Sequence, residues 1–126
     1  MKKTLLLGLF FLILISCKDR DSNCGCDSET KSVIPESRNF EAIISYNTDD
    51  NYYNNKFWLS VNEGAVYNYY IICNESILPS EVLKLKETGE TLRVNFSGET
   101  KEICEKNVSP ANYSYNQITL TKIQLQ

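Results

Sequence analysis

The sequence contains no histidine, and this absence excludes more functions than any residue that is present. Histidine is the commonest general base in enzymes and the commonest metal ligand, so most hydrolases and zinc enzymes are excluded. No nucleophile–base arrangement replaces it. We therefore expect a chain that is not an enzyme and needs no metal or other cofactor. Its 126 residues allow one domain and leave little room for a second.

The N-terminal residues have the layout of an export signal. Two lysines precede an apolar run over residues 5–15, which is too short for a membrane-spanning helix of about 20 residues. The run ends in Leu14-Ile15-Ser16-Cys17, which resembles the lipobox of bacterial lipoproteins. This resemblance implies that residues 1–16 are a signal peptide, cut before Cys17, and that Cys17 carries fatty acyl chains such as palmitate. The alternative is an ordinary secretory signal with a cysteine nearby.

The acyl chains on Cys17 would make the membrane the first partner of the mature chain, because several chains on one residue anchor a protein durably. The next residues, Lys18-Asp19-Arg20-Asp21, partly resemble the charged surface-export tag of Bacteroidetes lipoproteins. The alternative is a solvated tether. We expect a lipid anchor in the outer membrane, with the chain facing the periplasm or the cell surface.

The charge of the mature chain restricts its other partners. Signal cleavage removes two of the 13 basic residues and leaves all 16 acidic ones, so the net charge is −5. Nucleic acid and anionic lipid draw on lysine and arginine, and the sequence therefore predicts no nucleic-acid partner. An envelope protein, a peptide or a glycan remains.

The mature chain divides into a tether and a domain. Residues 17–38 are mostly polar and predict a flexible, lipidated tether, while residues 39–126 can form one small core. In the domain, apolar residues alternate as in strands near residues 40–46, 56–62, 66–74, 92–97 and 118–125. Gly98 is expected to close the fourth strand. The last segment changes phase, which predicts a β-bulge near Thr121-Lys122.

One helix is expected between the third and fourth strands. Pro79 suits its first turn, Leu78, Val82 and Leu85 share one face, and Gly89 can end it. Three strands, a helix and two strands follow the order of the OB-fold, a five-stranded barrel. We predict a mainly β, OB-like barrel, with a meander sandwich or open barrel as the alternative. Ile72-Cys73-Asn74, Phe96-Ser97-Gly98 and Ile103-Cys104 resemble small uncharacterised Bacteroidetes lipoproteins, which implies no activity.

Four cysteines remain beside Cys17, and an even number in an exported chain favours disulfides. We predict a Cys73–Cys104 bridge that holds the 98–116 connection against the barrel. Cys24 and Cys26 lie in the predicted tether. They could be a redox-active pair or bond a partner, and the favoured interpretation is an accidental or purely structural pair.

The expected binding surface is aromatic. Trp58 is predicted to point outward from the second strand and Tyr70 from the third, with Tyr52 and Tyr53 in the adjoining loop. OB-folds bind ligands on this face. The alternative is that the tether or the 98–116 connection, with Tyr113 and Tyr115, covers these rings.

Two acidic clusters do not fit a calcium site or a catalytic pair of carboxylates. Asp49-Asp50 matches no calcium loop, and the carboxylates of Glu99, Glu102 and Glu105 lie in a charged stretch with no cleft evident. The sequence thus predicts a lipid-anchored, non-catalytic binding or structural module of the envelope. The alternative is an inhibitor or accessory subunit that docks an exported protein through the aromatic face.

Overall fold

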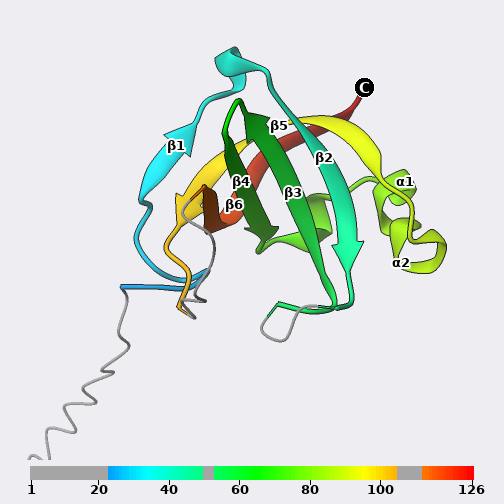
Figure 1. Ribbon diagram of the computed structural model, residues 1–126, viewed down its shortest axis with the longest axis horizontal. Coiled ribbons are helices and arrows are strands. Elements are labelled where there is room, and N and C mark those ends of the chain that lie inside the picture. Colours follow the sequence, from blue (N-terminus) through cyan, green and yellow to red (C-terminus); the bar gives the residue numbers. More distant parts are fainter. Residues whose placement is uncertain (1–22, 50–52, 105–111) are drawn as a thin grey trace, which may run out of the picture.

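The computed structural model describes residues 23–49, 53–104 and 112–126, which form a β-barrel with short helices at one end (Figure 1). The strands are β1 (Ser32–Ile34), β2 (Phe40–Asn47), β3 (Lys56–Glu63), β4 (Val66–Ile72), β5 (Leu92–Lys101) and β6 (Tyr113–Leu125). The helices are α1 (Ser80–Leu83) and α2 (Leu85–Thr88), with 3-10 turns η1 (Glu36–Arg38) and η2 (Glu75–Ile77).

Five strands close the barrel in the order β2-β3-β4-β6-β5, and β5 returns to pair with β2. All neighbouring strands are antiparallel except β4 and β6, which are parallel. Both helices lie between β4 and β5 in the chain. This order and the single parallel pair are those of an OB-like barrel, so the predicted fold class is confirmed.

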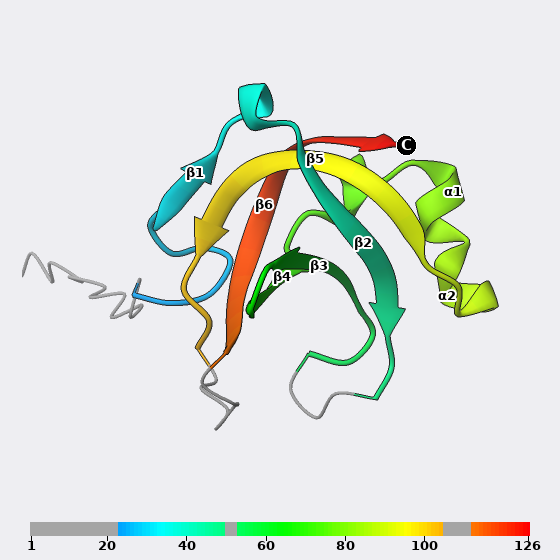
Figure 2. The same cartoon turned by 45° about the horizontal axis from the view of Figure 1, so that its top comes forward.

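The core follows the alternation that the sequence predicted. Ile44, Phe57, Leu59 and Val94 point into the barrel and are fully buried. The side chains of Leu78, Val82 and Leu85 join the same core from the helical segment. The helices therefore pack their apolar face against the barrel core. Figure 2 shows them beside the start of β5.

A β-bulge in β6 lies where the phase change predicted it. Ser97 pairs with Lys122 but Gly98 pairs with Leu120, so Thr121 is the extra residue. The sequence predicted that Gly98 ends β5, and that prediction is wrong: the strand continues to Lys101. A Cβ at Gly98 would lie 2.6 Å from the Thr119 carbonyl oxygen. Glycine is therefore needed for close strand approach rather than for a turn.

The N-terminal part of the barrel corrects the predicted tether. Residues 17–22 lie outside the described residues, but residues 23–38 are attached to β5. β1 pairs antiparallel with β5 next to the segment that pairs with β2, and Ile34 joins the core. The Lys101 ammonium, itself buried, donates to the Ser28 carbonyl at 2.8 Å. Composition alone predicted disorder because these contacts come from residues distant in sequence.

Two disulfides attach the same segment to the barrel and correct the predicted pairing. Cys73 and Cys104 are both oxidised, but not to each other: the bridges are Cys24–Cys104 and Cys26–Cys73. Gly25, between the first two cysteines, has a φ of 91° and donates its N–H to the Glu102 carbonyl. This left-handed conformation suits glycine and lets the neighbouring cysteines bond two different segments.

Candidate ligand-binding surface

A groove of about 440 Å³ crosses the outer face of β2, β3 and β4. A groove of this volume falls in the range of small-ligand sites. The residues that line it include Glu41, Ile43, Ser60, Asn62, Tyr67, Tyr69, Arg93 and Gln126. The predicted face of the barrel therefore is hollowed, although different residues line it.

Strand register arranges the groove residues in rows. Arg93 on β5 pairs with Ile43 on β2, which pairs with Ser60 on β3, and Ser60 pairs with Tyr69 on β4. Neighbouring strands lie about 4.8 Å apart, so this row extends roughly 14 Å from the guanidinium-bearing strand to the tyrosine. Ile43 lies inside this row, and 43% of its surface is exposed. The row thus offers an apolar middle between a cation and an aromatic ring.

A second row runs beside the first. Asn62 on β3 pairs with Tyr67 on β4, while Glu41 on β2 lies one pleat from Ile43 on the same face. Among the described residues, the side chains of Glu41, Asn62 and Arg93 form no hydrogen bond or ion pair. These polar groups are therefore available to a ligand.

The aromatic wall of the groove continues into a stack of tyrosines on β4 and β6. Tyr67 stacks on Tyr113 with ring centroids 5.2 Å apart, and Tyr69 lies against both Tyr113 and Tyr115. Because β4 and β6 are parallel and in register, the four rings alternate between the strands. Tyr67 is the last ring of this stack and is 36% exposed.

The Tyr69 hydroxyl stays uncharged at neutral pH. Burial raises the pKa of Tyr69 above its ordinary value, and the neighbouring Tyr113, Tyr115 and Tyr67 raise it further. A phenol already titrates near pH 10, so the upward direction keeps the ring neutral across the physiological range. Tyr69 therefore contributes a neutral hydroxyl to the aromatic wall.

Trp58 and Tyr70, the main predicted surface residues, are both buried. Trp58 is 7% exposed and packs against Ile71 and Ile103, and its indole N–H donates to the Tyr53 carbonyl at 3.1 Å. The alternative, in which the chain after β5 covers the indole, is the correct one. Tyr70 points into the barrel, where its ring contacts Phe96.

The structure places neither of the two loop tyrosines on the predicted binding surface. Tyr53 is half-buried and packs against the Trp58 cluster, so it covers the indole instead of extending a binding face. Tyr52 lies outside the described residues. The aromatic residues that do line the groove, Tyr67 and Tyr69, were not predicted.

The length of the turn before β4 fixes the strand register, and this register would have identified Tyr67 and Tyr69 as outward-facing residues. Glu63 pairs with Val66 across a two-residue loop, and each further pair follows from that count. Leu59 faces inward and pairs with Tyr70, so Tyr70 must face inward and Tyr69 outward. The run of bulky residues in β4 masked this phase because both faces are largely apolar.

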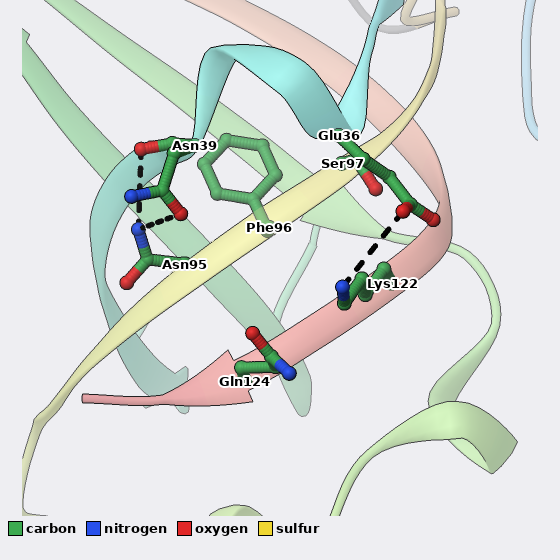
Figure 3. Close-up of a pocket in the computed structure, with 7 residues that line it drawn as sticks. All are labelled: Glu36, Asn39, Asn95, Phe96, Ser97, Lys122 and Gln124. Carbon is green, nitrogen blue, oxygen red and sulfur yellow. Dashed lines mark hydrogen bonds and ion pairs between the residues drawn. The ribbon is translucent and has the colours of Figure 1, made fainter.

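A second, smaller hollow lies beside η1, between β5 and β6 (Figure 3). Its volume of about 30 Å³ has room for one or two water molecules only. The Asn95 amide donates to the Asn39 side chain at 2.8 Å, and the Lys122 ammonium lies 3.8 Å from the Glu36 carboxylate. These groups satisfy one another and support the turn that leads from β1 to β2.

Among the described residues, the acidic side chains of the two clusters do not come together in a catalytic or metal-binding site. The Glu99 carboxylate accepts a hydrogen bond from Thr30, and Glu102 pairs with Lys31 at 2.9 Å. Both therefore hold the N-terminal segment, while Asp50 and Glu105 lie outside the described residues. Within residues 23–49, 53–104 and 112–126, no group of acidic or cysteine side chains is placed to hold a metal ion. The helices of these ranges are too short and polar to span a membrane.

Comparison with known proteins shows distant likeness only. No protein-family model matches the chain, and no curated protein matches its sequence. Two solved structures of asparaginyl-tRNA synthetase from Entamoeba histolytica, one with asparaginyl-adenylate, are similar at a TM-score of 0.41 and 16% identity. They cover 68% and 69% of this chain, which spans about one fifth of the synthetase.

This comparison corrects the predicted partners. The acidic charge of the mature chain was taken to exclude nucleic acid, yet the similar structures are of a tRNA synthetase. The exclusion of nucleic acid is therefore wrong and is not retained. The likeness assigns no ligand to this chain.

Proposed function

We propose that the protein is a lipid-anchored, non-catalytic binding module of the bacterial outer membrane, with the groove over β2, β3 and β4 as its ligand surface. The carrying observation is the groove itself, in which an aromatic wall and unpaired polar side chains meet on a rigid barrel. Binding surfaces combine apolar area with a few fixed polar groups in this way. The lipid anchor rests on the lipobox-like Leu14-Ile15-Ser16-Cys17.

The disulfides limit how far the groove can stand from the membrane. Cys24, which is bonded to the barrel, lies only seven positions after Cys17 in the sequence. A fully extended chain spans at most about 3.6 Å per residue, so the barrel lies within roughly 25 Å of the acylated residue. A lipid-anchored barrel would therefore act close to the membrane surface rather than at the end of a long tether.

A second candidate function is an accessory subunit or inhibitor that docks an exported protein. The stacked tyrosines favour it, because rigid aromatic side chains are common anchors of protein interfaces. Tyr113 and Tyr115 extend this wall beyond the groove, onto β6. A docked protein would cover these two rings as well as Tyr67 and Tyr69.

We expect Cys17→Ala to remove the lipid anchor. Without its thiol the chain cannot accept a diacylglyceryl group, so metabolic labelling with palmitate should be lost and the protein should leave the membrane fraction. Ser16→Ala is the matched control, since it keeps a small residue before the cysteine and should remain labelled. Labelled Cys17→Ala protein would refute the anchor.

We expect Tyr67 and Tyr69 to be protected from hydroxyl-radical oxidation in intact envelopes, relative to the purified full-length chain. Leu83 on α1, which is 40% exposed and does not line the groove, should be oxidised equally in both samples. Protection limited to the groove tyrosines supports a small ligand, and protection that includes Tyr113 and Tyr115 supports the docked protein. Equal oxidation of all four rings contradicts both functions.

A further inference from the structure

The groove joins an aromatic ring, a small apolar floor and free polar side chains, which is the chemistry of a sugar site. We propose that its ligand is a neutral oligosaccharide, with one sugar ring stacked on Tyr67. This inference rests on the proposed function of the groove as a binding surface. It adds the class of ligand and the residues that contact it.

The strands beneath the groove offer no backbone groups to a ligand. β3 is hydrogen-bonded to β2 on one side and to β4 on the other, and β4 is bonded to β3 and β6. A peptide that binds by strand addition needs a free strand edge. Side chains must therefore provide the contacts in the groove, as they do for a ligand rich in hydroxyl groups.

The free polar groups match neighbouring hydroxyls. Glu41 accepts hydrogen bonds through two carboxylate oxygens, Arg93 donates through a planar guanidinium, and the Asn62 amide does both. All three are exposed and, within the described residues, none is engaged by another side chain. A sugar hydroxyl both donates and accepts, so a pair of adjacent hydroxyls can satisfy such groups together.

Tyr67 provides the apolar contact that a sugar ring needs. One face of its ring stacks on Tyr113 at a 20° interplanar angle, which fixes the ring in place while 36% of the residue stays exposed. The face of an aromatic ring carries partial negative charge, and it attracts the polarised C–H groups of a pyranose. Because the stack orders the ring before binding, little conformational entropy is lost on contact.

The charge of the groove favours an uncharged ligand. One carboxylate, Glu41, and one guanidinium, Arg93, line it, and their charges cancel. A single-stranded nucleic acid is held mainly by rows of lysine and arginine along its phosphates. Nucleic acid and peptide are therefore kept as outcomes of the test, and a neutral glycan is the ligand we infer.

The test follows the tyrosine ring signals of the full chain in detergent micelles by NMR. The probes are neutral oligosaccharides derived from cellulose, mannan and chitin, with an oligouridylate and a mixed peptide digest added separately. We expect at least one neutral oligosaccharide to shift the Tyr67 and Tyr69 signals. Tyr67→Ala should weaken that binding about ten-fold. Tyr67→Phe, which keeps the ring face, should retain most of it.

Val66→Ala is the matched control, because Val66 is exposed beside Tyr67 but does not line the groove; its binding should be unchanged. Groove shifts with the oligouridylate or the peptides alone would overturn the glycan inference and leave the binding module in place. If no probe shifts the groove signals, the glycan inference fails. Failure of the radical-protection experiment as well would also remove the groove as a binding surface.

Discussion

Replacing Trp58 with alanine is expected to lower the free energy of unfolding by about 3–5 kcal/mol, the usual effect of truncating a buried aromatic residue. The indole is 7% exposed, packs with Ile71 and Ile103, and makes edge contacts with Tyr69 and Tyr115. Its loss would leave a cavity and remove the hydrogen bond from the indole N–H to the Tyr53 carbonyl. Urea unfolding followed by circular dichroism measures the change, because the variant has no tryptophan for fluorescence.

Tyr67→Ala is the control for this experiment. Its side chain stands at the exposed end of the tyrosine stack, so the free energy of unfolding should fall by no more than about 1 kcal/mol. The two variants thus separate packing from binding: Trp58 changes stability, and Tyr67 changes ligand affinity. A stable Trp58→Ala protein with weakened glycan binding would return Trp58 to the binding surface.

Removing one disulfide is expected to have an effect of similar size. In the variant Cys26→Ser/Cys73→Ser, a cross-link between residues 47 apart in sequence is lost from the unfolded chain. Chain entropy predicts a decrease of about 3–4 kcal/mol in the free energy of unfolding. For a domain of this size the melting temperature should fall by roughly 15 °C or more. Calorimetry on the variant and on the oxidised wild type measures both quantities.

The second bridge provides the matched comparison. Cys24→Ser/Cys104→Ser removes a cross-link between residues 80 apart, so it should destabilise the protein at least as much. Mass spectrometry of unreduced peptides should link Cys24 with Cys104 in the first variant and Cys26 with Cys73 in the second. In the unreduced wild-type protein, which keeps all four cysteines, a peptide that joins Cys73 directly to Cys104 would contradict the connectivity described above.

The disulfides also explain why residues 23–38 belong to the folded domain. A short polar segment cannot repay its ordering entropy with its own contacts. Here the bridges reduce that entropy in advance, and β1, Ile34 and the buried Lys101 contact then add to the barrel at little further cost. Reduction of both bridges should therefore loosen this segment before the barrel itself.

The barrel could be predicted from local patterns. Val94 and Phe96, both buried, alternate with polar neighbours, and a two-residue period identifies the buried face of a strand without knowledge of its partner. The bulge at Thr121 followed from a break in the same period. Gly89 was expected to end the helical segment, and its φ of 66° confirms it.

The candidate site could be predicted only in part. The sequence predicted an aromatic binding surface on the second and third strands of the barrel, and the groove lies over these strands, β3 and β4, and over β2. It assigned the wrong aromatic residues there, because β4 carries bulky side chains on both faces and alternation alone cannot tell them apart. Pairing with β3 decides that Tyr70 is inside and Tyr69 outside.

Taken alone, the sequence determined the order of the five barrel strands, the inward faces of most of them and the helical segment, and it contains the lipobox-like motif before Cys17. Those features depend on neighbours a few residues apart along the chain. The tertiary structure alone decided which cysteines bond, that Trp58 is covered and that Tyr67 and Tyr69 form the groove wall. These outcomes depend on which distant segments meet in space, and the period of a single strand carries no information about its partners.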